Sequence, residues 1–168
     1  NENIAFTAIL AHEWWHQAQF EYDQEWDFID QLSNASEVAR FSELEADFAA
    51  AYFLTHKRGA TYNWKRIEDF FKLSFNVGDC LINSDNHHGT PGQRLAAAEF
   101  GYQLAASAQK KGFILSPSEV HYAFLEIYND LKKEDPNIVV TIYPSLLKYD
   151  KNLDYLPLSG LSNRKTIH

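Results

Sequence analysis

Hydrophobic residues recur along most of the chain at the three- and four-residue spacing of an amphipathic helix, and short runs of cap and turn residues separate these stretches. The pattern therefore predicts a mainly α-helical fold with little β structure. We expect helices over about residues 3–20, 37–57, 64–75, 91–111 and 117–135. The first is densely apolar, so we expect it to be the central helix of the fold.

Local signals mark where these helices begin and end. Asn34 lies among three candidate N-caps for the second helix, and Gly59 is expected to end that helix. The run Thr90-Pro91-Gly92-Gln93 combines an N-cap, a proline at the first helical position and a capping-box glutamine. Ser116-Pro117-Ser118-Glu119 repeats this arrangement for the last helix, and Gly112 is expected to end the helix before it.

The remainder of the chain is expected to be less regular. Residues 138–143 are rich in β-branched side chains and predict a short strand, within an irregular C-terminal extension over 137–168. A length of 168 residues is typical of one domain. The chain contains no Met and enters the first helical pattern directly after Asn3, so we expect it to be a fragment that lacks an upstream segment.

The formal net charge is −8, with 15 Lys and Arg against 23 Asp and Glu. A chain without an excess of cations is poorly suited to nucleic-acid phosphates or anionic lipid, so we expect no nucleic-acid partner. Its apolar runs are shorter than the roughly 18 residues of a membrane span, so we expect a soluble domain without membrane contact. The single cysteine, Cys80, excludes an internal disulfide and a cysteine-rich zinc cluster.

The first predicted helix carries an H-E-x-x-H pattern from His12 to His16, with Glu13 in the second position. Residues four apart on a helix share a face, so both imidazoles can reach one ion while Glu13 flanks it. Imidazole nitrogen and carboxylate oxygen are ligands that zinc prefers, and a catalytic zinc site has three protein ligands. The pattern therefore predicts a zinc site that needs one more ligand.

The second predicted helix supplies candidates for that third ligand. Glu43 and Glu45 lie about 200° apart around a helix, so both cannot face the same ion. Glu43 shares its face with small residues that allow a close approach to the first helix, whereas Glu45 shares its face with bulkier ones. We therefore predict Glu43 as the ligand. Asp47, one turn further along, is placed to accept a hydrogen bond from the outer nitrogen of a ligating histidine.

Three motifs follow one another along the chain: the run from His12 through His16 to Gln19, an E-x-x-A-D run from Glu43 to Asp47, and a run from His88 through Gly89-Thr90 to Gln93-Arg94. Together they resemble the motifs of the bacterial neutral zinc metallopeptidases. The resemblance spans a little over half the chain and implies a zincin-like domain of the gluzincin type. It also implies His12, His16 and Glu43 as zinc ligands and Glu13 as the catalytic base.

The expected activity is that of a zinc-dependent metallopeptidase acting on peptides or proteins. Glu13 would take a proton from the attacking water and give it to the leaving amine. His87, His88 and Arg94 are candidate donors to the developing oxyanion. We favour His88, which belongs to the third motif and precedes a helix N-terminus, although it could equally serve as a local hydrogen-bonding residue.

Two other functions agree with the same residues. The first is a zinc hydrolase of a small amide. The second is a zinc-stabilised helical binding module without catalysis, because Trp14 and Trp15 stand within the motif and would narrow the approach to the metal. The remaining histidines, at positions 56, 121 and 168, are isolated in the sequence and are expected on the surface. Cys80 is expected to be a small buried apolar residue.

Overall fold

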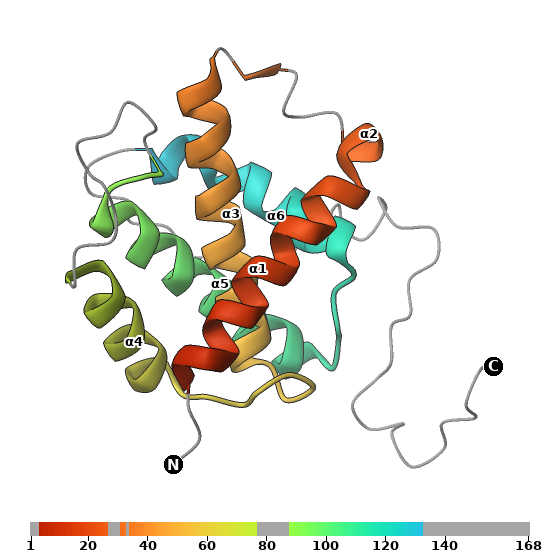
Figure 1. Cartoon of the computed structure of the whole chain (residues 1–168). Coiled ribbons are helices and arrows are strands. Elements are labelled where there is room, and N and C mark those ends of the chain that lie inside the picture. Colours follow the sequence, from red (N-terminus) through yellow and green to blue (C-terminus); the bar gives the residue numbers. More distant parts are fainter. Residues whose placement is uncertain (1–3, 27–30, 33, 77–87, 133–168) are drawn as a thin grey trace.

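The fold comes from a computed structural model that describes residues 4–26, 31–32, 34–76 and 88–132. Within these residues every regular element is a helix, which confirms the predicted mainly α-helical class. Figure 1 shows them in chain order: α1 (Ile4–Glu21), α2 (Asp23–Trp26), α3 (Ala35–Thr55), α4 (Trp64–Asn76), α5 (Pro91–Lys111) and α6 (Pro117–Leu131). The predicted strand and C-terminal extension lie outside the described residues.

The centre of the fold is α3, which packs against both α1 and α5. Its sequence is rich in alanine, and Ala46, Ala50 and Ala51 are buried where neighbouring helices approach. A glycine allows the closest approach from α5, since a Cβ atom added to Gly101 would lie 1.9 Å from the carbonyl oxygen of Phe48. Small residues on both helices thus bring α3 close to its partners.

The predicted central position of the first helix is wrong for the described residues. Of the 18 residues in α1, only Ala8 and Gln19 are buried. The helix lies across α3 and contributes one face to the core. Large apolar side chains on its other positions are exposed, namely Phe6, Ile9, Leu10, Trp14 and Phe20. Apolar density along the sequence therefore did not identify the buried helix, because α1 is apolar on more sides than it buries.

The local start and stop signals agree well with the helix ends. Asn34 caps α3, and Thr90 and Ser116 form complete capping boxes with Gln93 and Glu119. Gly112 ends α5 in the left-handed conformation with φ 82°. The end of α3 differs from expectation, because it stops at Thr55 and not near Gly59. The last helix ends at Leu131, a few residues earlier than predicted.

The acidic, aromatic-rich stretch after α1 contains the single turn α2, which buries Trp26. None of the helices in the described part of the chain is long and apolar enough to cross a bilayer.

Candidate metal centre

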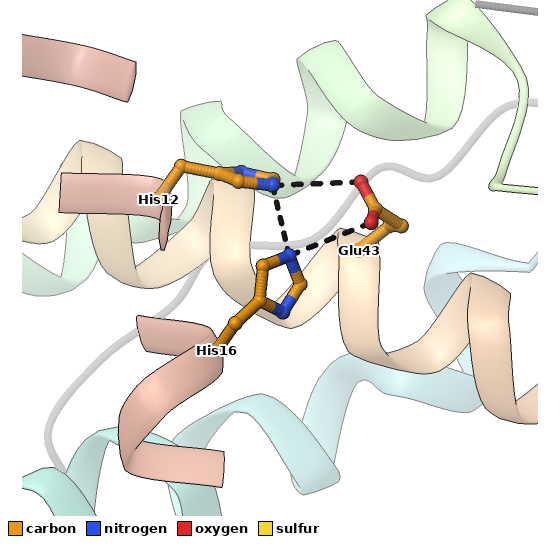
Figure 2. Close-up of side chains that lie close together, drawn as sticks. All are labelled: His12, His16 and Glu43. Carbon is orange, nitrogen blue, oxygen red and sulfur yellow. Dashed lines mark hydrogen bonds and ion pairs between the residues drawn. The ribbon is translucent and has the colours of Figure 1, made fainter. Parts of the chain in front are cut away.

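Three predicted ligands meet where α1 crosses α3. His12 and His16 point from successive turns of α1 towards Glu43 on α3 (Figure 2). The two imidazole Nε2 atoms are 3.1 Å apart, and they lie 3.5 Å and 3.4 Å from the two carboxylate oxygens of Glu43. One ligand atom from each residue lies within 4.8 Å of the others, so the set could hold a metal ion.

The outer nitrogen of each histidine has its own acceptor. His12 Nδ1 lies 3.0 Å from Asp47 Oδ1, and His16 Nδ1 lies 2.8 Å from Gln19 Oε1. Because a carboxylate and an amide oxygen only accept, both Nδ1 atoms must carry the proton and donate. Both Nε2 atoms then face the cluster, and in the neutral rings their lone pairs are available to a cation.

Asp47 is itself held by Arg94 of α5. The guanidinium donates from Nε to Asp47 Oδ2 at 2.6 Å and from Nη2 to Asp47 Oδ1 at 3.0 Å, a two-pronged contact. Its Nη2 is also 3.4 Å from Glu43 Oε2. Arg94 is predicted from the sequence as a candidate oxyanion donor, whereas in the structure it contacts both carboxylates and orients them.

Gln19 is held in place by Glu45, the glutamate of α3 that is not predicted as a ligand. Its amide nitrogen donates to Glu45 Oε2 at 2.7 Å and to the carbonyl oxygen of Ser42 at 3.1 Å, which fixes the amide oxygen towards His16. Glu45 faces away from Glu43, as the helical spacing requires, and is fully buried. The i, i+3 spacing of His16 and Gln19 on one helix was the available sequence signal for this contact.

The predicted surface location of His56 and His121 is wrong. Both are buried, and His121 Nδ1 lies 2.5 Å from Glu45 Oε1 while its ring stacks on Trp26 at 4.1 Å between centroids. His121 therefore forms the far end of a buried chain of contacts that runs through Glu45 and Gln19 to His16. His168 and Cys80 lie outside the described residues.

When no cation is bound, the contacts within the cluster favour the protonated form of both histidines and the ionised form of Glu43. Burial alone would lower the pKa of His12, but the carboxylates of Asp47 and Glu43 overcome this effect and raise it from 6.5 to about 9. The hydrogen bond to Glu43 likewise raises the pKa of His16. Burial opposes ionisation of Glu43, yet its contacts with the two histidines and Arg94 lower the pKa of its carboxyl group.

Of the two predicted catalytic residues, His88 reaches the edge of this cluster. Glu13 is exposed on α1 beside His12. His88 Nδ1 is 3.5 Å from Glu43 Oε1, and its side chain is 45% exposed. The residue after it, Gly89, has φ 90°, and a Cβ atom there would lie 2.9 Å from Leu44 Cδ2. This glycine lets the chain pass close to α3 and bring His88 to Glu43.

Trp14 and Trp15 do not form part of the cluster. Both line a separate cavity that shares no residue with His12, His16 and Glu43. Trp15 also stacks on Trp26, with 5.9 Å between ring centroids. That these two side chains narrow the approach to the metal stays a prediction.

Comparison with known proteins adds no independent indication of function. No protein-family model matches the chain, and neither the curated proteins nor the solved structures contain a significant match. The assignment of a function thus depends on the side-chain geometry and on the sequence motifs of the chain.

Proposed function

We propose that the protein is a zinc-dependent metallopeptidase of zincin-like, gluzincin type, with His12, His16 and Glu43 as the metal ligands. The observation that carries this proposal is the convergence of two imidazoles and one carboxylate from the two helices. The order of the motifs along the chain supports the same function. A peptide or protein is the expected substrate, and Asp47 is the hydrogen-bond partner that orients His12.

The separations between ligand atoms suit a small tetrahedral ion. Zinc–nitrogen and zinc–oxygen bonds of about 2.0–2.1 Å at tetrahedral angles place ligand atoms about 3.3 Å apart. The two Nε2 atoms, 3.1 Å apart, agree with this value, and each lies 3.4–3.5 Å from a different oxygen of Glu43, so that one ligand atom from each residue lies within 4.8 Å of the others. The donor set of two nitrogens and one oxygen also favours zinc over calcium or magnesium, which prefer oxygen alone.

The chain's own residues supply the remaining chemistry. A bound zinc ion would acidify water and polarise a substrate carbonyl. Glu13 is exposed and follows the proposed ligand His12 on α1, and its carboxylate would accept a proton from water and return it to a leaving amine. His88 stands at the edge of the cluster, where its ring can donate a hydrogen bond to a substrate oxygen.

Two measurements on the same sample test the proposal. Metal analysis of the purified chain is expected to give one zinc per chain, and hydrolysis of a peptide library should depend on that zinc. Removal of zinc with a chelator should abolish turnover, and one equivalent of zinc should restore it. A chain that binds no zinc would contradict the whole proposal, whereas bound zinc without turnover would contradict only the peptidase.

The position of His88 favours one second candidate, a structural zinc site. Since His88 Nδ1 is 3.5 Å from Glu43 Oε1, His88 is a candidate fourth ligand, and a fourth protein ligand would leave no open position for water. The protein would then be a zinc-stabilised helical binding module.

His88→Ala separates the two functions. In the peptidase, zinc content should remain at one per chain while kcat/KM falls by about 10²- to 10³-fold, the usual effect of losing an oxyanion donor. In the structural site, zinc affinity should fall by more than about 10-fold, because a ligand has been lost. Competition with a chromogenic chelator measures the affinity, and peptide hydrolysis measures the turnover.

Zinc affinity is expected to rise with pH. In the metal-free chain His12 has a pKa raised from 6.5 to about 9, so near neutral pH zinc must displace its proton. Each displaced proton makes affinity rise about tenfold per pH unit below that pKa. Titration with a chelator of known proton affinity at about pH 6, 7 and 8 measures this slope. An affinity that does not change with pH would contradict the proposed role of His12.

The stability of the metal-free chain should fall as pH rises, whereas its zinc affinity should increase. Because the pKa of His12 is raised on folding, its stabilising contribution is complete below pH 6.5 and is lost as pH rises through about 9. The difference in Tm between the zinc-loaded and metal-free chain should therefore widen over that range.

A further inference from the structure

The exposed side of α1 carries a contiguous row of large apolar side chains. Five residues, each between 52% and 80% exposed, form this apolar face of α1, namely Phe6, Ile9, Leu10, Trp14 and Phe20. At about 100° per residue, the five positions fall within about 140° of one another around the helix. Single exposed apolar residues are common on proteins, whereas a contiguous exposed patch usually marks an interaction site.

Carboxylates accompany the apolar face, and cations do not. The exposed residues of α1 and α2 include four carboxylates, at Glu13, Glu21, Asp23 and Glu25. Residues 1–39 carry eight Asp and Glu and no Lys or Arg, whereas residues 40–168 carry 15 acidic and 15 basic residues. The whole net charge of −8 therefore resides in the part of the chain that contains the apolar face.

One edge of the apolar face adjoins a cavity of about 290 Å³. Trp14 belongs to both, and Trp15, Phe53 and Leu115 are among the other residues that line the cavity. Its wall is almost wholly apolar, so the cavity suits an apolar side chain. Docked helices usually bind through a few apolar anchors that fill such pockets.

We propose that the apolar face of α1 docks a cationic amphipathic helix of a partner protein. The apolar stripe of that helix lies along the five exposed side chains, and one of its apolar residues fills the cavity beside Trp14. Its Lys or Arg residues flank the stripe and lie beside the carboxylates of α1 and α2, because opposite charges across an interface favour the correct pair. The proposal uses none of the metal ligands and is independent of the proposed metal centre.

The charge of this region selects such a partner over two others that could cover the same face. A second copy of the chain would bring carboxylates against carboxylates, and like charges brought together across an interface are unfavourable. An anionic membrane surface would be repelled for the same reason. A helix with Lys or Arg beside its apolar stripe has neither disadvantage.

Three fluorescently labelled peptides of 18 residues, the length of α1, test the proposal on the full chain. The first has leucine at the i, i+3, i+4 and i+7 positions of a helix and lysine elsewhere. The second has glutamate in place of lysine, and the third has the composition of the first in an order without a helical period. By fluorescence anisotropy, we expect the first to bind with a Kd of about 10 μM or tighter and the others at least about tenfold more weakly. Equal binding of the lysine and glutamate peptides, or no binding of the lysine peptide at about 1 mM, would overturn the proposal.

A double variant of the apolar face assigns the binding to α1. Leu10→Gln combined with Trp14→Gln removes two exposed apolar contacts, so the lysine peptide should bind at least about tenfold more weakly. Both side chains are more than half exposed, so far-UV circular dichroism should be unchanged. An unchanged affinity for the lysine peptide would overturn the proposal.

Charge reversal tests the role of the carboxylates. Glu21→Lys combined with Glu25→Lys should weaken the lysine peptide and strengthen the glutamate peptide. Glu99→Lys combined with Glu126→Lys is the matched control, because it makes the same change of charge at exposed positions of α5 and α6. Equal effects of the two double variants would show that only the total charge matters and would overturn the proposal.

Sedimentation of the chain without peptide tests the second copy as the occupant. We expect a monomer at about 100 μM, because the acidic region opposes self-association. A dimer that the Leu10→Gln, Trp14→Gln variant dissociates would overturn the proposal and assign the apolar face to contacts between copies of this chain.

Discussion

Replacement of Glu43 with alanine is expected to abolish tight zinc binding while the helices remain folded. Glu43 is the only carboxylate among the three converging ligands, and it is partly exposed, with 21% of its side chain accessible. Its loss leaves two neutral imidazoles on one helix, which cannot complete a catalytic zinc site. We expect the bound zinc to fall from one per chain to a trace after dialysis.

The choice of control for this experiment depends on the fold. Glu45→Ala is unsuitable, because Glu45 is buried and holds both Gln19 and His121. Glu37→Ala removes the same charge from the first turn of α3, where the side chain pairs with Lys132. Zinc content should be unchanged in Glu37→Ala, and far-UV circular dichroism should be the same for both variants. Equal loss of zinc in both variants, or in neither, would exclude Glu43 as a ligand.

Helix positions were predictable from the sequence because the signals that set them are local. The capping boxes at Thr90 and Ser116 need only residues three positions apart, so their geometry is contained in a single turn. The juxtaposition of His12 and His16 is equally local, since the helical repeat alone puts them on one face. Their meeting with Glu43 needed one further inference, namely that small residues would let α3 approach α1.

Burial was less predictable, because it depends on which helices meet. Glu45 and His121 are 76 positions apart, and nothing near either residue indicates that they will pair inside the core. The dense apolar pattern of α1 likewise predicted a central, buried helix, whereas only Ala8 and Gln19 of α1 are buried. Arg94 was a recognised candidate near the site, but its two-pronged contact with Asp47 requires the packing of α5 on α3.

Glu13→Gln is expected to retain zinc and lose turnover. The amide keeps the size and much of the hydrogen bonding of the side chain, yet it cannot accept the proton of an attacking water. We therefore expect one zinc per chain and a decrease in kcat/KM of about 10²-fold or more. Glu21→Gln, the same change at an exposed position later in α1, should leave both quantities unaltered.

The combination of these two readouts makes the result specific to catalysis. A structural metal site would show no turnover in the parent chain, so Glu13→Gln could remove none. A decrease in turnover accompanied by loss of zinc would indicate that Glu13 supports the metal and does not act as the base. Only retained zinc with lost turnover agrees with a proton-transfer role, because Glu13 is exposed and is absent from the converging ligand set.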